Sequence, residues 1–270
     1  MTPLSEFEQR IYNEGERLIP GITHNLEELI RHRNSYMFWK RIIEHDVATG
    51  NTSDPIRILD LGSGVGHGCV TLAEIPGTEV VGIDNEAEVI AYARSKYPAP
   101  NITYEVADIV AYVKSMTEFD YVVSRGVLEH IPDGLTVARD ARWSKRLMFD
   151  VPYQESEGNP HHVLHFIGEQ DFGGFDHAEL FYQDLQGVTY DHEHKPERAN
   201  MIMCVARTAI LPAIADAGFT FPDLIWQPKP DDPLWEWERR NRATLTVQPP
   251  LPKRVIGKLQ RIARDLLNRS

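Results

Sequence analysis

Short apolar runs alternate with amphipathic stretches between residues 56 and 152. Runs rich in branched and aromatic side chains predict strands at 56–60, 79–83, 102–106, 121–123 and 146–149. Apolar residues at helical spacing predict helices between these strands, near 67–75, 86–96, 108–116 and 134–142. This alternation predicts βαβ units and a mostly parallel sheet with helices on both faces. Because such sheets bind ligands at the carboxyl ends of their strands, we look for chemistry in the loops that follow them.

The flanking segments divide the chain into three parts. Residues 1–54 show two helical patterns separated by Pro20-Gly21, and we expect an N-terminal helical cap there. Strand patterns at 179–182 and 201–206 extend the central domain to residues 55–208. Residues 209–270 form a C-terminal extension, in which we expect a short helix near 209–217 and a helix at the end.

Composition narrows the class of protein. The chain has 270 residues, of which 42% are hydrophobic and 25% charged, as in soluble globular proteins. A net charge of −12 argues against nucleic-acid binding, which requires clustered basic side chains. Cys69 and Cys204 cannot build a disulfide framework, and we see neither a secretory signal nor a membrane-spanning apolar run. We therefore expect a cytoplasmic protein.

The last twenty residues have the opposite charge. Residues 251–270 hold six basic side chains and one acidic side chain, with apolar residues along one helical stripe. Such a basic amphipathic helix is a candidate contact with the inner face of a membrane or with a protein partner. Docking of the helix on its own domain is the alternative.

A glycine-rich loop follows the first predicted strand, in Asp60-Leu61-Gly62-Ser63-Gly64-Val65-Gly66-His67-Gly68. Glycines permit a tight turn and let a ligand approach the backbone closely. The G-x-G-x-x-G spacing of dinucleotide-binding loops is not met, because its last position falls on His67 or Cys69. A phosphate-binding G-K-[ST] element is also missing from the sequence, which disfavours both classes of nucleotide site.

The loop resembles motif I of the class I S-adenosylmethionine-dependent methyltransferases. Three further segments resemble that family in order, namely Val81-Gly82-Ile83-Asp84, Val106-Ala107-Asp108-Ile109 and the block from Phe119-Asp120 to Val127-Leu128-Glu129-His130-Ile131-Pro132-Asp133. The resemblance covers about residues 56–152. It implies S-adenosylmethionine as the cofactor and a Rossmann-like α/β fold, with a seven-stranded, mostly parallel sheet and a reversed hairpin from about 178–184 and 200–207.

The resemblance also implies roles for single residues. Asp84 would bind the ribose hydroxyls, Asp108 would reach the adenine amino group, and Ile109 would pack on the adenine ring. A carboxylate can accept both ribose hydroxyl protons, which agrees with the first of these roles. The expected cofactor contacts are Tyr36, Asp60, Gly62, Ser63, Gly64, Gly66, Asp84, Asn85, Asp108, Ile109, Ser124 and Arg125.

Two segments outside the core resemble methyltransferases from bacterial glycan and polysaccharide loci. One is the stretch from Gly15-Glu16-Arg17 through Tyr36-Met37-Phe38, although Ser35 stands where that pattern has arginine and Arg31 where it has glutamate. The alternative for this stretch is a helix that simply packs on the sheet. The other is Val151-Pro152-Tyr153 followed by Asn159-Pro160-His161-His162. This resemblance implies a sugar or glycan intermediate as the methyl acceptor.

Methylation of a sugar hydroxyl calls for a general base, because the hydroxyl is a poor nucleophile at neutral pH. Histidine has a suitable intrinsic pKa. His162 matches the motif histidine and is the first candidate base, followed by His130 and His165; a structural role is the alternative for each. Because the methyl group of the cofactor is already activated, the protein mainly has to align the nucleophile, the methyl group and the leaving sulfur.

Six of the eleven histidines lie between His161 and His194, which raises the question of a metal site. His192-Glu193-His194 would place two imidazoles on one face of a strand, but the spacing matches no compact metal motif, and we expect no metal. Trp226, Trp235 and Trp237 could stack on a sugar or pack in the core.

The sequence therefore predicts an O-methyltransferase for a sugar or glycan intermediate. The alternatives are a methyltransferase for a quinone, polyketide or lipid hydroxyl, a non-catalytic cofactor-binding regulator of a glycan assembly complex, and a nicotinamide oxidoreductase. The glycine spacing disfavours the last of these.

Overall fold

The computed structural model describes residues 4–14, 17–22, 26–50 and 54–228. Its contacts group the chain up to Gln227 into one compact unit. No helix within these ranges is both long enough and apolar enough to cross a membrane. The predicted terminal helix at 251–270, together with Trp235 and Trp237, lies outside the described residues, and the boundaries 1–54, 55–208 and 209–270 stay predictions.

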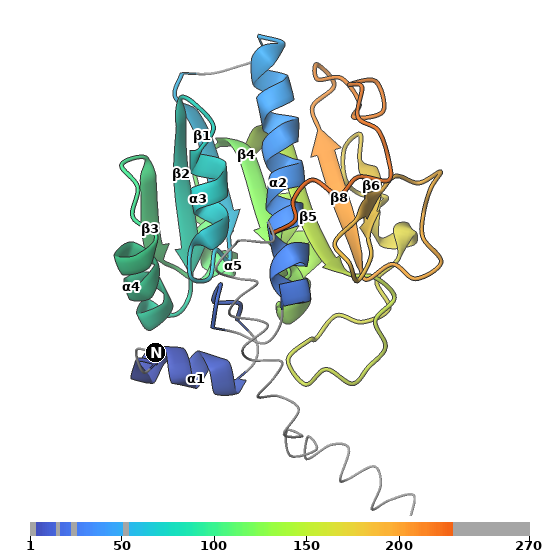
Figure 1. Cartoon of the computed structure of the whole chain (residues 1–270). Helices are drawn as coiled ribbons and strands as arrows, with labels where there is room; N and C mark the ends of the chain where they lie inside the picture. The colour runs from blue at the N-terminus through green and yellow to red at the C-terminus, as the bar shows by residue number, and fades with distance from the viewer. Residues whose placement is uncertain (1–3, 15–16, 23–25, 51–53, 229–270) are drawn as a thin grey trace, which may run out of the picture. The chain divides into compact units, whose positions relative to one another are not determined.

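A central sheet runs through the unit that ends at Gln227 (Figure 1). It has eight strands. Its strands follow one another in space in the order β3-β2-β1-β4-β5-β8-β6-β7. The pairs among β1 to β5 are parallel, whereas β8 pairs antiparallel with both β5 and β6. The strands are β1 (Ile56–Leu61), β2 (Thr78–Asp84), β3 (Ile102–Val106), β4 (Phe119–Arg125), β5 (Trp143–Pro152), β6 (Glu179–Gln183), β7 (Thr189–Tyr190) and β8 (Met201–Arg207).

Helices cover both faces of this sheet, because side chains along each strand alternate between two apolar layers. One layer contains Ile58 and Val123 and packs under α2, α3 and α4; the other contains Leu59 and Val122 and packs under α5 and α6. The helices are α1 (Glu6–Glu14), α2 (Leu26–Ala48), α3 (His67–Ala73), α4 (Ala87–Lys96), α5 (Ile109–Ser115) and α6 (Gly134–Asp140), with the short 3-10 helices η1 (Leu128–His130) and η2 (Glu169–Phe172).

A buried ion pair fixes α2 to the middle of the sheet. Asp46 of α2 and Arg146 of β5 are both fully buried, and two guanidinium nitrogens donate to the carboxylate at 2.7 and 2.8 Å. The Tyr121 hydroxyl donates to the same carboxylate at 3.3 Å, and Arg146 also donates to the Pro212 carbonyl at 3.0 Å. Because α2 carries side chains of the candidate site, this pair helps to position that site.

The predicted α/β architecture, the order of its strands and helices and the antiparallel β6–β8 pair are confirmed. The strand count of seven is wrong by one, since Thr189–Tyr190 adds a two-residue edge strand against β6. His192 and His194 therefore lie in a turn after β7 and not on a strand.

The helix predicted at 209–217 does not form. Pro212 lacks an N–H and interrupts helical hydrogen bonding there. The Glu179 carboxylate instead accepts from the N–H groups of Ile214 and Ala215, at 2.8 and 3.2 Å. Hydrogen bonds to the Glu179 side chain thus take the place of helical backbone hydrogen bonds at these two residues.

Candidate cofactor pocket and acceptor end

A cavity of about 520 Å³ lies at the carboxyl ends of β1, β2 and β4. This volume suits a small-molecule ligand. Most of the predicted cofactor contacts contribute to its wall, as expected for the carboxyl edge of a parallel sheet. They are Tyr36, Gly62, Ser63, Gly64, Asp84, Asn85, Asp108, Ile109 and Arg125.

The glycine loop makes its turn through backbone conformations that other residues rarely adopt. Gly62 has φ of 79°, and a Cβ at this position would lie 2.5 Å from a methyl carbon of Val127. Gly64 has φ of 52°, and a Cβ there would meet no atom within 4 Å. Gly62 thus closes the turn against the next loop, while Gly64 leaves open space in the wall where a ligand can approach the backbone.

The other three predicted contacts lie behind the wall and support it. Asp60 is fully buried and accepts hydrogen bonds from the Tyr36 hydroxyl at 3.1 Å and the Cys69 thiol at 3.3 Å. Burial raises the pKa of Asp60 to about 7. The Ser124 hydroxyl donates to the Leu61 carbonyl at 2.9 Å. A Cβ on Gly66 would lie 2.5 Å from the Tyr104 hydroxyl, so this glycine permits close packing of the loop.

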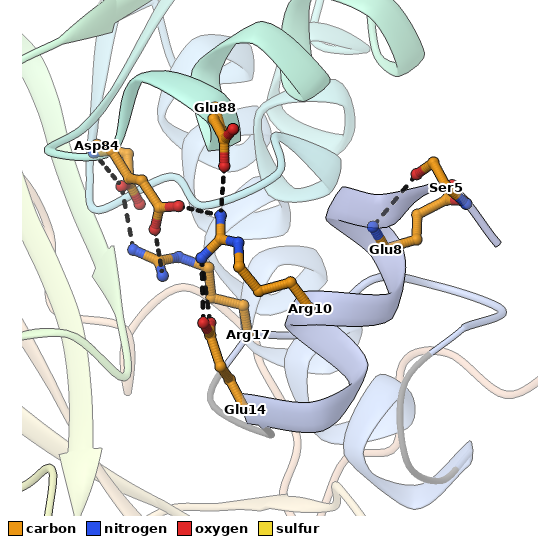
Figure 2. Close-up of polar contacts among 8 residues, drawn as sticks. Ser5, Glu8, Arg10, Glu14, Arg17, Asp84 and Glu88 are labelled. Atoms are coloured by element: carbon orange, nitrogen blue, oxygen red, sulfur yellow. Dashed lines mark hydrogen bonds and ion pairs between the residues drawn. The ribbon is translucent and has the colours of Figure 1, made fainter.

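Asp84, at the end of β2, is held by charged groups from the N-terminal segment (Figure 2). Its carboxylate lies 3.3 Å from Arg17 and accepts from the Glu86 backbone N–H at 3.0 Å. Arg17 also pairs with Glu86 at 2.9 Å, and Arg10 of α1 pairs with Glu88 at 2.9 Å. The segment around α1 thus reaches the cofactor pocket, and Arg17 is part of the pocket wall.

Two neutral imidazoles line the side of the pocket next to α2. Burial is the main cause that lowers the pKa of His32 to about 4 and that of His67 to about 3. Both ring nitrogens of His67 and the hydroxyl of Ser63 are buried without a hydrogen-bond partner among the described residues. Buried polar groups normally have partners, so these atoms indicate a polar ligand in the cavity.

Arg125, at the end of β4, is a second guanidinium in the pocket wall, in addition to Arg17. Its Nε lies 3.2 Å from the buried carboxylate of Asp150, which also accepts from the Ser35 hydroxyl at 2.8 Å and from the Gly126 N–H at 3.0 Å. Burial raises the pKa of Asp150 and the neighbouring guanidinium opposes that rise. Ser35 of α2 stands where the glycan-locus pattern has an arginine. Its hydroxyl donates to Asp150, the same carboxylate that pairs with Arg125.

The residues of this pocket fit S-adenosylmethionine. Asp84 and Asp108 offer acceptors for hydroxyl and amino groups, Gly64 leaves space at the backbone, and His67 and Ser63 have unsatisfied polar atoms. Ligand donors and acceptors would satisfy these groups, which a purely apolar molecule could not do.

Histidines form the end of the pocket beyond the β4 strand. His130, in η1, contributes to the wall together with His161, whose carbonyl lies 3.0 Å from His130 Nδ1. The His162 ring lies behind His130, with 4.7 Å between ring centroids and an edge-to-face arrangement. The third candidate base, His165, lies outside the cavity wall, and its Nδ1 is buried without a hydrogen-bond partner in the described part of the chain.

Carboxylates surround His162. Its Nδ1 bonds to the Glu155 carboxylate, and its Nε2 lies 3.0 Å from the Asn159 amide and 4.0 Å from a carboxylate oxygen of Glu129. Glu129 is 2% exposed, and burial raises its pKa to about 8. The structure therefore brings His130 and His162 together and leaves His165 apart.

The sequence-based selection missed several groups at this site. They are Arg17, His32 and His67 in the wall, and Glu129 and Glu155 beside His162. Arg17, His32, His67 and Glu129 all lie within the segments that resemble methyltransferase motifs, so their position there was an available signal. No sequence signal distinguished Glu155 from other loop carboxylates.

Comparisons with known proteins agree with this geometry. Residues 58–143 match the family model described as a methyltransferase domain. Phosphoethanolamine N-methyltransferase 1 of Zea mays is 29% identical over 157 residues, which cover 55% of this chain and 31% of that protein. Arsenite methyltransferase of Aquipseudomonas alcaligenes is 31% identical over 100 residues, which cover 33% of this chain and 29% of that protein. The matches thus span less than a third of these relatives.

One solved structure shows the same fold over most of the chain. The N-terminal domain of EvdMO1, crystallised in the presence of SAH and D-fucose, has a TM-score of 0.51 and 18% identity and covers 75% of this chain and 95% of that chain. The family match, the fold and the pocket agree on one assignment. Residues 58–143 therefore belong to a methyltransferase domain of the class I S-adenosylmethionine-dependent family.

Proposed function

We propose that the protein transfers a methyl group from S-adenosylmethionine to a hydroxyl of a sugar or glycan intermediate. The observation that carries this proposal is a single cavity whose wall contains both the expected cofactor contacts and His130 and His161. We call the His130 and His161 side of this cavity the acceptor end. When bound, S-adenosylmethionine supplies an already activated methyl group on a sulfonium. The protein's own residues then have to orient the acceptor and take up its proton.

Asp84 and Asp108 would hold the ribose and adenine of the cofactor, as the family resemblance implies. Their carboxylates lie in the wall, at the ends of β2 and β3. Ser63 and His67 would satisfy their buried polar atoms at the amino-acid end. This arrangement leaves the His130 and His161 side of the cavity for the acceptor.

His130, the histidine ring at that end of the wall, is oriented to accept a proton. A carbonyl oxygen only accepts hydrogen bonds, so the contact with the His161 carbonyl requires the proton of a neutral His130 on Nδ1. The carboxylate of Glu155 favours the same tautomer in His162. A neutral His130 then carries the lone pair on Nε2, the nitrogen that can receive the hydroxyl proton. His162 lies behind this ring, and its own Nε2 accepts from the Asn159 amide nitrogen at 3.0 Å.

Two observations on other proteins bear on the acceptor. The N-terminal domain of EvdMO1, which has the same fold, was crystallised in the presence of D-fucose. This agrees with the resemblance of the 151–166 segment to enzymes of glycan loci. The curated relatives are named for phosphoethanolamine and arsenite, so a non-sugar small molecule is the second candidate.

Mass spectrometry with isotope-labelled cofactor tests this proposal. The full chain is incubated with nucleotide sugars, lipid-linked glycans, phosphoethanolamine and simple phenols, and labelled methyl products are sought. We expect label on a sugar hydroxyl, with the rate strongly reduced in His130→Ala and retained in His165→Ala, since only the former histidine lies in the wall. Label on nitrogen or on a phenol alone would overturn the sugar assignment.

We also propose that residues 251–270 attach the enzyme to an anionic membrane surface on the cytoplasmic side, where lipid-linked acceptors are found. The support is the basic, amphipathic pattern of this segment. Co-sedimentation with liposomes that contain anionic lipid should fall when residues 251–270 are removed. Equal partitioning of both forms would overturn the membrane contact.

A further inference from the structure

Three potential metal ligands meet behind the acceptor end of the cavity. Glu129, His130 and His162 each offer one ligand atom, and these atoms lie within 4.8 Å of one another. Bonds from zinc to nitrogen and oxygen ligands are about 2.0–2.2 Å long, so small side-chain rotations would bring all three atoms onto one cation. No compact metal-binding motif marks this group in the sequence. Glu129 and His130 are adjacent, whereas His162 lies more than thirty residues further along the chain.

The backbones that carry these ligands are fixed to each other. The N–H groups of Val163 and Leu164 both donate to the Glu129 carbonyl, at 2.8 and 3.1 Å. This contact joins η1 to the loop that follows β5 and places His162 beside Glu129. Such preorganisation lowers the conformational cost of assembling a metal site.

The outer contacts of both histidines are those of metal-binding imidazoles. His130 Nδ1 lies 3.0 Å from a backbone carbonyl, and His162 Nδ1 bonds to the carboxylate of Glu155. A carboxylate or carbonyl on Nδ1 orients the ring and makes Nε2 the ligand. The Asn159 amide nitrogen, 3.0 Å from His162 Nε2, donates to the lone pair of that nitrogen, and a cation would take the place of this donor.

The burial of Glu129 provides an independent indication that a cation binds here. Its side chain is almost fully buried, and its Oε2 has no hydrogen-bond partner among the residues that the structure describes. Leaving a carboxyl oxygen unsatisfied in a buried position is costly unless something binds it. The other oxygen, Oε1, lies 4.0 Å from His162 Nε2, and a cation bound there would offset the cost of burying this carboxylate.

We propose that Glu129, His130 and His162 bind a divalent first-row transition-metal cation, such as zinc, at the acceptor end of the cavity. Two imidazoles and one carboxylate suit zinc, cobalt or iron better than magnesium, which prefers oxygen ligands. Three protein ligands also leave coordination positions for a substrate oxygen. The metal expected from sequence alone was none, and the three-dimensional grouping is the reason to revise that expectation.

A role for this cation at the methyl acceptor rests on the proposed function. The binding of the cation by Glu129, His130 and His162 does not. In the loaded site the imidazoles act as ligands, and the cation lowers the pKa of the acceptor hydroxyl. The O–H bond then breaks with its electron pair left on oxygen, and the proton passes to water. In a metal-free site His130 itself would take up this proton, as described above.

Cobalt(II) titration of the chelator-stripped full chain tests the proposal without any turnover. We expect a saturable visible absorption band at one equivalent, displaced by zinc. Glu129→Gln and His162→Ala should abolish the band. Glu155→Gln should weaken binding about 10- to 100-fold, because it removes an outer contact of a ligand.

The His194→Ala variant is the matched control, since His194 is an exposed histidine that pairs with Asp191 at 2.7 Å outside the cluster. It should bind cobalt as the unaltered chain does. Circular dichroism of each stripped variant checks folding, and the near-isosteric Glu129→Gln variant keeps the test decisive if His162→Ala unfolds. Failure of the unaltered chain to bind, or equal binding by Glu129→Gln, would overturn the site.

Methyl transfer is measured separately and separates this proposal from the proposed function. Metal binding by a chain that methylates nothing in the panel would refute the function and support the site. Methyl transfer that persists in chelator, by a chain that binds no cobalt, would support the function and refute the site.

Discussion

The buried carboxyl of Glu129 makes the stability of the metal-free protein depend on pH. Burial raises its pKa from an ordinary 4.5 to about 8. A folded-state pKa above the unfolded value contributes stability that is fully present below the unfolded pKa and is lost as pH rises through the folded pKa. The unaltered protein should therefore lose stability from this group as the pH rises from about 4.5 to 8.

The Glu129→Gln variant removes this titration while keeping the size and shape of the side chain. With pKa values of 4.5 and about 8, the linkage relation gives a loss of about 2.5 kcal/mol in the unaltered protein between pH 5 and pH 7. Glu129 is 2% exposed, so solvent screening reduces this figure little. The free energy of unfolding of the variant, relative to the unaltered protein, should rise by this amount over that interval.

Urea denaturation followed by tryptophan fluorescence, in chelator-treated buffer at several pH values, measures this difference. Other titrating groups, Asp60 among them, are present in both proteins and cancel. Glu157→Gln, a change at an exposed glutamate of the 153–168 loop, is the control and should leave the difference flat. A flat difference for Glu129→Gln as well would refute the reasoning that burial holds this carboxyl in its protonated form.

Three further predictions concern the elements that position the site. Asp46→Ala leaves Arg146 buried without its carboxylate and should lower the free energy of unfolding by about 3–5 kcal/mol in chemical denaturation. The Asp46→Leu/Arg146→Met double variant should recover much of this loss, and an equal loss in both variants would contradict the charge argument. Gly62→Ala should destabilise the protein by more than about 1 kcal/mol, because its Cβ would lie 2.5 Å from Val127 at positive φ, and an unchanged melting temperature would contradict this. Asp84→Asn should weaken binding of S-adenosylhomocysteine roughly 10- to 100-fold in calorimetry, since hydrogen bonds to a charged group contribute about 1.5–3 kcal/mol; unchanged affinity would remove Asp84 from the ribose.

The sequence predicted most of the strands and helices, because their apolar side chains recur at the spacing of a strand or a helix. Apolar periodicity located β1 to β6, β8 and the helices α1 to α6, because each buries one face or stripe against the sheet. It failed at 209–217, where Pro212 and the Glu179 carboxylate decide the backbone, and at Thr189–Tyr190, which is too short to show alternation. These elements depend on tertiary partners that sequence spacing does not reveal.

The convergence of most of the expected cofactor contacts on one cavity was predictable, because these residues follow strands of one parallel sheet, whose carboxyl ends lie together. The grouping of the histidines was not, because it depends on how the loop after β5 folds back on η1. His162 carried a motif signal, yet its contacts with Glu155 and Glu129 arise from this loop closure. Arg17 likewise comes from far upstream and reaches Asp84 only through the folded N-terminal segment.

The most direct test of the account is transfer of a labelled methyl group by the full chain to a defined sugar acceptor. We expect a labelled, methylated sugar hydroxyl with the unaltered protein, and little product with Asp84→Ala or His130→Ala, because both side chains belong to the wall of one cavity. Full transfer by both variants, or label recovered on nitrogen or arsenic with none on a sugar hydroxyl, would contradict it.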